Sequence, residues 1–235
     1  MATTVEVLSE AFDEMGTPFI VGHPGGETVE LMEAARNRQV RFMLMKQETA
    51  GAMLASTWGE ITGSPGVCVS TRGPGAANMV NGVAHAWMDR APLIAINDQY
   101  PGATLATGMR QVMNQHALFA PITKWQTTIH AKSVRQQIRR AIRVTTSPTP
   151  GPVQFDMPSN ETMSEAGETV AEAPLLPNIV PIEPDRNALK VPLQALSTAR
   201  KPILLAGLGV FWDKASAELV ALAERLGAPV LTTSK

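Results

Sequence analysis

The sequence predicts an α/β fold of three layers, in which a parallel sheet carries helices on both faces. Short apolar runs alternate with segments of helical periodicity along nearly the whole chain of 235 residues. Such alternation is typical of strands joined by crossover helices, and these strands pair in parallel. The apolar runs lack polar alternation, as in Leu93–Ile96, which indicates strands that are buried on both faces.

Composition and charge restrict the class of protein. Hydrophobic residues make up 44% of the chain and charged residues 17%, which is typical of a well-packed soluble protein. A net charge of −1 argues against nucleic acid or an anionic membrane as the main partner, because both require a basic face. No apolar run reaches the ~20 residues that span a bilayer. The N-terminus lacks the pattern of a signal peptide, so we expect a cytoplasmic protein.

Cysteine and histidine give no sign of a metal site. The single cysteine, Cys68, excludes an internal disulfide and a clustered thiolate site. It lies within an apolar run, so we interpret it as a small buried hydrophobe. The histidines do not have the spacing of metal ligands. They are His23, His85, His116 and His130.

The first elements alternate regularly. Residues 3–16 carry apolar side chains at helical spacing, and Gly16 closes this pattern. A short strand is predicted over 18–21, followed by a glycine-rich loop over 22–26 that exposes its backbone. The next expected elements are a helix over 27–36, a strand over 40–45, a helix over 49–62 and a strand over 66–70.

The second part of this domain contains a long segment without periodicity. Residues 71–78 predict a loop that leads into a helix over 79–88, and the next strand covers 92–97. Residues 98–116 show little periodicity, and a loop of that length in a compact domain is usually functional or disordered. The remaining expected elements are a strand over 125–129, a helix with a basic outer face over 134–144 and a strand over 152–156. We expect the domain to cover residues 1–157.

Residues 158–185 differ in composition from the rest. Prolines recur among several acids, which is typical of an interdomain linker. Over 186–235 the alternation resumes, and this segment is expected to begin a second, Rossmann-like α/β domain. So few elements cannot form an independent core, so we expect this domain to be incomplete and the sequence to be the front part of a longer protein. Its expected elements are a helix over 189–199, a strand over 202–206, a helix over 215–226 and a strand over 229–232.

Three predicted loops leave successive strands at one edge of the sheet. Parallel strands end together there, and open α/β sheets bind small molecules at their carboxyl ends. One loop delivers the carboxylate of Glu48, which by itself is better explained as an acid favoured by the helix dipole. Another contains Gly73-Pro74-Gly75, whose backbone N–H groups could face a ligand. A tight strand-to-helix turn is the alternative interpretation of that segment.

Four motifs, taken in order, resemble the pyrimidine-binding domain of thiamine diphosphate enzymes, in the group of acetolactate synthase, benzaldehyde lyase and related decarboxylases. They are Gly-His-Pro-Gly-Gly from 22, Lys-Gln-Glu-Thr-Ala-Gly-Ala-Met from 46, Thr-Arg-Gly-Pro-Gly-Ala-Ala-Asn from 71 and Ala-Trp-Met-Asp-Arg-Ala-Pro-Leu-Ile-Ala-Ile from 86. Residues 151–158 resemble the end of that domain, and residues 186–235 resemble the start of the family's central domain. The resemblance therefore covers nearly the whole chain.

The resemblance assigns roles to particular residues. Glu48 matches the glutamate that hydrogen-bonds N1′ of the cofactor's aminopyrimidine and favours the imino tautomer at N4′. That nitrogen takes the proton from thiazolium C2, and the ylid attacks the carbonyl of a 2-keto acid or aldehyde. The implied activity is that of a carboligase or decarboxylase, with Glu48 as catalytic residue. The other implied cofactor-binding residues are His23, Pro24, Gly25, Gly73, Pro74, Asn78 and Gln111.

Three positions depart from the family pattern. Gln47 stands where histidine is frequent. Glu27 stands where some relatives place a histidine or a small residue near the reacting carbon, and Arg110 replaces an apolar residue common in the synthases. Glu27 and Arg110 are therefore candidates for contact with substrate. Solvated side chains are the alternative at both positions.

The resemblance also implies a part that this sequence does not contain. The family holds the diphosphate and Mg²⁺ through a C-terminal domain with Gly-Asp-Gly followed by Asn-Asn, and neither motif occurs here. In the family the site lies between subunits, so we expect a homodimer or homotetramer with the site at the subunit interface. The chain alone would carry half a site, bind the cofactor weakly and show no turnover.

Two other functions remain open at this point. The chain can be a non-catalytic binding or assembly half that a separate diphosphate-binding subunit complements. It can also be a nucleotide-binding α/β protein of unrelated function. The sequence does not indicate FAD, and it leaves open whether the central domain would hold FAD or ADP.

Overall fold

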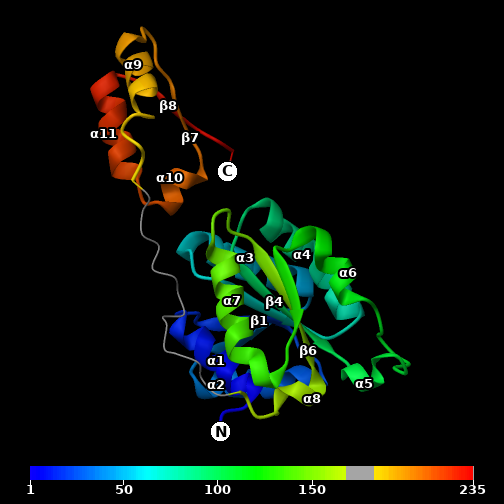
Figure 1. The fold of residues 1–235 in the computed structure, drawn as a ribbon. Coiled ribbons are helices and arrows are strands. Elements are labelled where there is room, and N and C mark those ends of the chain that lie inside the picture. Colours follow the sequence, from blue (N-terminus) through cyan, green and yellow to red (C-terminus); the bar gives the residue numbers. More distant parts are fainter. Residues whose placement is uncertain (168–182, 235) are drawn as a thin grey trace. The chain divides into compact units, whose positions relative to one another are not determined.

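The computed structural model describes residues 1–167 and 183–234, which form two compact units on either side of the intervening segment. Most of the linker expected over 158–185 therefore lies outside the described residues. The first unit contains a six-stranded sheet in the order β2-β1-β3-β4-β6-β5, and every pairing in it is parallel (Figure 1). Its strands are β1 (Phe19–His23), β2 (Arg41–Leu44), β3 (Gly66–Ser70), β4 (Leu93–Gln99), β5 (Trp125–Thr128) and β6 (Pro152–Pro158).

Two apolar clusters cover the two faces of this sheet. Successive residues of β4 point to opposite faces, so Ile94 and Ile96 join one cluster while Leu93 and Ala95 join the other. The first cluster packs under α1 (Thr4–Glu14), α2 (Val29–Asn37) and α7 (Val134–Thr146). The second packs under α3 (Glu48–Thr62), α4 (Pro74–Met88) and α6 (Gln115–Phe119). The predicted three-layer parallel α/β fold is confirmed.

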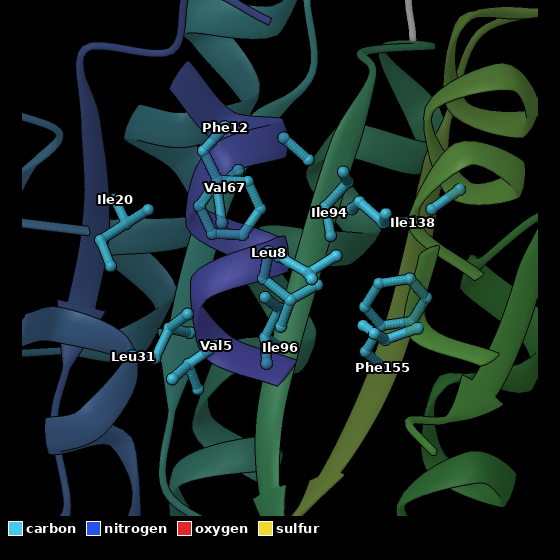
Figure 2. Packing of buried hydrophobic residues seen from close by; sticks show 14 of the residues in the cluster. Val5, Leu8, Phe12, Ile20, Leu31, Val67, Ile94, Ile96, Ile138 and Phe155 are labelled. Atoms are coloured by element: carbon cyan, nitrogen blue, oxygen red, sulfur yellow. The ribbon is translucent and has the colours of Figure 1, made fainter. Parts of the chain in front are cut away.

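The packing of α1 shows how an amphipathic helix closes one of these layers. Val5, Leu8 and Phe12 recur on one side of the helix and point at the sheet, where they share a cluster with Val67 of β3 and Ile96 of β4 (Figure 2). Leu8 and Phe12 are fully buried. Burying side chains of this size stabilises the fold by about 1.5–3 kcal/mol each.

The helix α4 begins five residues earlier than the sequence pattern predicts. The segment 71–78 was expected to be a loop, but Pro74 is the first residue of the helix. Proline suits that position because its fixed φ is helical and the first helical N–H has no partner within the helix. Gly73 precedes it with a φ of 63°, which glycine adopts readily. Asn78 therefore lies within a helix and not in a loop.

The long segment after β4 also contains more regular structure than expected. β4 continues to Gln99, α5 (Gly102–Leu105) follows, and α6 begins at Gln115. After β6, α8 (Ser159–Thr162) leads to a bridge between Glu165 and Thr3, and Ala166 is buried in the first cluster. Residues 159–166 thus pack on the first unit.

The second unit has a two-stranded parallel sheet, which agrees with the predicted alternation. Its elements are α9 (Lys190–Thr198), β7 (Leu204–Ala206), α10 (Leu208–Trp212), α11 (Ser216–Leu226) and β8 (Val230–Thr232). Large apolar side chains of these elements are exposed, among them Val191, Leu205 and Leu231. The described part of this unit buries little apolar surface.

Two absences apply to the residues that the structure describes. Over 1–167 and 183–234, no helix combines the length and apolar character that crossing a membrane requires. Within the same ranges, no three histidine, cysteine, aspartate or glutamate side chains gather in a way that would hold a metal ion.

Candidate functional site

The three loops singled out in the sequence meet at one edge of the sheet. β1 lies between β2 and β3, with Gly22 opposite Leu44 and His23 opposite Ser70. Because all three strands run in the same direction, the segments that follow them leave at the same edge. The ring of His23 is tied to the next loop through a 2.9 Å contact between its Nδ1 and the carbonyl oxygen of Met45.

Glu48 is the first residue of α3 and brings a buried carboxylate to this edge. Glu48 as a whole is only 8% exposed. Oε2 accepts a hydrogen bond from Nδ2 of Asn78, which reaches across from α4. Oε1 lies beside Gly75, where a Cβ atom would be 3.2 Å away. The N-terminal end of a helix favours a negative charge at this position.

Small residues hold α3 and α4 close together around this carboxylate. A Cβ on Gly82 of α4 would lie 2.5 Å from Cβ of Ala52 on α3. Gly51 approaches β1 so closely that its Cβ would be 3.2 Å from Cα of Gly22. The hydroxyl of Thr49 donates to the carbonyl oxygen of Asn78. The position of Glu48 relative to the first turns of α4 is therefore fixed by backbone packing.

The turn before α4 is in contact with the long segment that follows β4. A Cβ on Gly73 would overlap the backbone carbonyl of Gln111, so the two backbones touch. The N–H of Gly73 donates to Oε1 of Gln115 over 2.9 Å. Gln111 has a φ of 57° and an exposed side chain. The structure thus brings Gln111 to the glycine turn through its backbone.

The other expected site residues lie around this group with different exposure. Pro24 and Gly25 are half-buried after β1, and the N–H of Gly25 donates to Oγ1 of Thr28. Pro74 is exposed, and Arg110 is exposed on the segment between α5 and α6. The side chain of Glu27 lies outside what the structure describes.

Several polar residues at this edge were not singled out in the sequence. Arg72 and Asp98 form a buried ion pair, with 3.0 Å between Nε and Oδ2, and the guanidinium stacks 4.0 Å from the centre of the Tyr100 ring. Burial raises the pKa of Asp98 to about 6, against the opposing effect of Arg72. The visible signal was the run Asn97-Asp98-Gln99 directly after an apolar strand.

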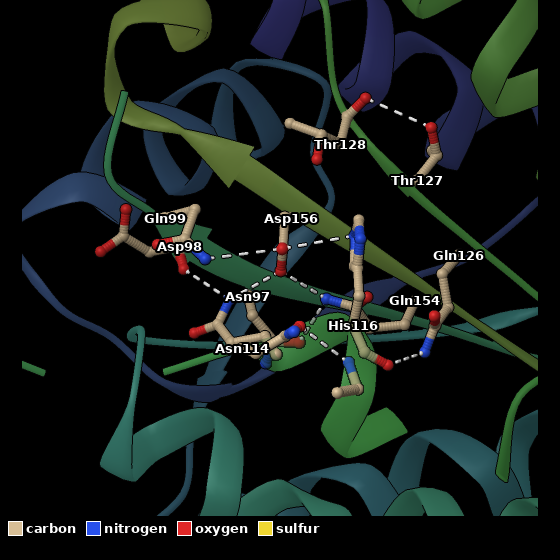
Figure 3. A network of polar contacts seen from close by, with 12 residues as sticks. Asn97, Asp98, Gln99, Asn114, His116, Gln126, Thr127, Thr128, Gln154 and Asp156 are labelled. Atoms are coloured by element: carbon tan, nitrogen blue, oxygen red, sulfur yellow. Dashed lines mark hydrogen bonds and ion pairs between the residues drawn. The ribbon is translucent and has the colours of Figure 1, made fainter. Parts of the chain in front are cut away.

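A crevice of about 470 Å³ lies beyond the carboxyl ends of β4, β5 and β6. His116 lines it and forms a 3.3 Å contact from Nε2 to Oδ2 of Asp156, which is nearly buried. Asp156 is one of two polar residues within the otherwise apolar β6, and Gln154 is the other. Polar side chains inside a central strand were the signal for this cluster, and they are prominent in Figure 3.

Comparisons with known proteins agree in both parts of the chain. Residues 2–118 match the family model of the thiamine pyrophosphate enzyme N-terminal TPP binding domain, and residues 189–235 match the model of the thiamine pyrophosphate enzyme central domain. A probable acetolactate synthase large subunit of Methanocaldococcus jannaschii is 32% identical over 233 residues, which are 97% of this chain and 39% of that protein. The acetolactate synthase of Arabidopsis thaliana chloroplasts is 31% identical over 97% of this chain and 34% of its own length.

A solved structure shows the same fold. The thiamine diphosphate-dependent 4-hydroxybenzoylformate decarboxylase of Rhodococcus jostii RHA1 aligns with a TM-score of 0.86 and 25% identity, over 99% of this chain and 44% of that one. The chain therefore spans less than half the length of these relatives.

The residues at the sheet edge fit the pyrimidine end of the cofactor named in the family description. A ring with polar nitrogens is recognised by a few precisely placed polar groups. Glu48 supplies a carboxylate that Asn78 orients, and the residue beside its Oε1 is Gly75, which has no side chain. The two family models, the relatives and this geometry agree that the chain belongs to the thiamine pyrophosphate enzymes and carries their N-terminal binding domain.

Proposed function

We propose that the first unit binds the aminopyrimidine of thiamine diphosphate and that Glu48 hydrogen-bonds its N1′ atom. The position of Glu48 is the observation that carries this proposal. Its carboxylate is nearly buried at the edge where three loops meet, and one oxygen is already held by Asn78. The other oxygen faces Gly75. Glu48 is therefore oriented by the protein through one oxygen, and we assign the hydrogen bond to N1′ to the other.

The roles of the neighbouring residues follow from the same geometry. Asn78 fixes Oε2, so a proton can be held or moved at Oε1 of Glu48 without loss of its orientation. Gly73 and Gly75 let the backbone of the turn pack closely against Gln111, Thr71 and the carboxylate of Glu48. When bound, thiamine diphosphate supplies an electron sink for making and breaking bonds next to a carbonyl.

The proposed reaction class is that of a carboligase or decarboxylase acting on 2-keto acids or aldehydes, similar to acetolactate synthase. The names of the relatives, which are acetolactate synthases and a decarboxylase, support it. We place the protein in the cytoplasm as a homodimer or homotetramer, with the site at the subunit interface. Mg²⁺ and the diphosphate would be held by a further domain, so residues 1–235 alone are expected to bind the cofactor weakly and to show no turnover.

Binding to the chain itself tests the role of Glu48. A ¹⁵N-labelled sample titrated with millimolar thiamine diphosphate should show shifts of the amide signals of Gly73 and Gly75. Glu48→Gln should weaken this binding about tenfold, which corresponds to ~1.4 kcal/mol and is typical of a hydrogen bond to a charged group. Glu14→Gln, at an exposed glutamate of α1, serves as the matched control. Equal binding by the wild type and Glu48→Gln would refute the assignment.

A second assay concerns the chemistry. In a form that also contains the diphosphate-binding domain, Glu48→Gln should slow exchange of the C2 hydrogen of thiamine diphosphate severely, because the proton at N1′ would lose its acceptor. Exchange at the wild-type rate would remove Glu48 from the mechanism. Parallel titrations with NAD and ADP address the unrelated nucleotide-binding function, and a strong response to NAD alone would favour that function.

A further inference from the structure

The glycine turn beside Glu48 depends on one side chain that comes from a distant part of the sequence. Gln115, at the start of α6, is 1% exposed. Its Oε1 accepts the N–H of Gly73, and its Nε2 donates to Oδ1 of Asp156 over 2.6 Å and to the carbonyl oxygen of Asp98 over 3.2 Å. Every one of these partners belongs to a different segment of the chain.

The chemistry of the partners fixes which way the Gln115 amide points. An ionised aspartate only accepts hydrogen bonds, so Nε2 must face Asp156. Oε1 then faces Gly73, whose backbone N–H only donates. A flipped amide would set an oxygen against the carboxylate and an N–H against another N–H, and both contacts are repulsive.

Asp156 is itself held in place, which makes Gln115 part of a connected polar network. Oδ1 of Asp156 also accepts from Nε2 of Gln154 over 2.8 Å, and Oδ2 lies 3.3 Å from Nε2 of His116 (Figure 3). Gln154 in turn donates to Oδ1 of Asn97 over 2.9 Å. Both side-chain polar atoms of Gln115 and both of Asp156 have partners in this network, and buried polar groups that are satisfied in this way are held rigidly. The support for Gly73 is therefore anchored in the centre of the sheet.

The turn needs such an anchor because glycine brings no conformational preference of its own. Gly73 has φ 63° and ψ −112°, outside the regions that other residues favour. Pro74 follows it as the first residue of α4, so the turn sets where that helix begins. Gly75 and Asn78, which contact Glu48, lie in the first two turns of the same helix.

We propose that Gln115 is a positioning residue of the thiamine site. It holds the Gly73 turn, and through it the start of α4, in the arrangement that places Gly75 and Asn78 around the carboxylate of Glu48. The proposal rests on the function proposed above for this site. It assigns Gln115 no contact with the cofactor.

Hydrogen exchange of the Gly73 amide tests the proposal without any cofactor. In the wild-type chain this amide should exchange slowly. Gln115→Met keeps the length of the side chain and removes the acceptor, so the Gly73 amide should exchange at least tenfold faster and thiamine diphosphate should bind about tenfold more weakly. The matched control is Gln126→Met. It removes a 2.8 Å hydrogen bond to the carbonyl oxygen of His116, on the same helix as Gln115, and should leave both quantities unchanged.

A second variant gives a pH signature that a general loss of packing would not produce. Gln115→Glu keeps an acceptor for Gly73 but places a carboxyl group against Asp156. The two groups repel when both are ionised and share a proton at lower pH. Protection of the Gly73 amide should therefore be weak near pH 7 and return as the pH falls to about 5. The wild type measured over the same range controls for the other ionisable groups near Asp156, which are His116 and Asp98.

The outcomes separate this proposal from the proposed function. If Glu48→Gln weakens binding while Gln115→Met changes neither exchange nor binding, the role of Gln115 is refuted and the function stands. If the wild type does not bind thiamine diphosphate, the function fails and the proposal fails with it. If Gln115→Met does not fold, the wild-type exchange rate and the pH profile of Gln115→Glu decide. A Gly73 amide that exchanges at the unprotected rate in the folded wild type would refute the proposal.

Discussion

Replacing Gly75 by alanine should place a methyl group between Thr71 and the carboxylate of Glu48. The new Cβ would overlap Oγ1 of Thr71 and would lie 3.4 Å from its Cβ and 3.2 Å from Oε1 of Glu48. Overpacking of this kind costs about 1–3 kcal/mol. Alanine within a helix gains about 1 kcal/mol over glycine. We therefore expect Gly75→Ala to destabilise the first unit by about 1 kcal/mol.

The clash with Thr71 can be isolated by a double-mutant cycle. Thr71→Ala removes Oγ1, so Gly75→Ala in that background should keep the helical gain of about 1 kcal/mol without the main overlap. The coupling energy between the two substitutions should then be about 1–3 kcal/mol.

Guanidinium unfolding followed by tryptophan fluorescence measures these energies. Trp58, Trp87 and Trp125 belong to the first unit, and Trp212→Phe removes the tryptophan of the second, so that the signal reports one unit only. Additive effects, within the ~0.5 kcal/mol expected of independent sites, would refute the proposed contact between positions 71 and 75. Thiamine diphosphate titration of the same variants shows whether displacement of Glu48 also weakens binding.

Three further predictions concern other parts of the first unit. Because the folded pKa of Asp98 is about 6, above the ~3.9 of an unfolded chain, the folded state binds more protons between these values, and the Asp98 contribution to stability falls as the pH rises through this window. The wild type should lose on the order of 1–2 kcal/mol of unfolding free energy through this group between pH 4 and pH 6.5, once solvent screening is allowed for, and Asp98→Asn should not show that loss. An equal change in unfolding free energy between the two pH values in both proteins would contradict this. Thr3→Ala should lower the unfolding free energy by about 1 kcal/mol, because it breaks the capping box with Glu6. An unchanged midpoint of guanidinium unfolding would count against the capping role of Thr3. Gly22→Ala should prevent close pairing of β1 and β3, because the new Cβ would meet the backbone of Val69, and native-like expression and melting temperature would disprove it.

The helices and strands were predictable because the local pattern of apolar residues shows which faces are buried. Leu93–Ile96 lies in a strand with both faces covered, and an apolar run shows this directly. The start of α4 was not predictable in the same way. Gly73-Pro74-Gly75 has the composition of a turn. The helix starts there because Pro74 follows a glycine with positive φ and occupies the first helical position, which the composition alone does not reveal.

The candidate site was likewise predictable only in part. Glu48 and the glycine turn come from loops that follow adjacent strands, so their convergence follows from a parallel sheet. Gln115 and Asp156 are brought together across 41 residues of sequence, and no local pattern encodes that distance. Polar residues inside an apolar strand, such as Asp156, were the only local sign that the interior contains a network at this point.

The strand order also has a consequence for how the chain acquires its structure during synthesis. Among the strands that the structure describes, β5 pairs with β6 alone, although β6 follows it in the sequence, so this pairing waits until residue 152 and its successors have left the ribosome. The strands β2, β1, β3 and β4 can assemble earlier, since they pair with one another. Asp156 arrives with β6, and it completes the support of Gln115. We therefore expect the nascent domain to complete the Gly73 turn late, after the first four strands have been able to pair.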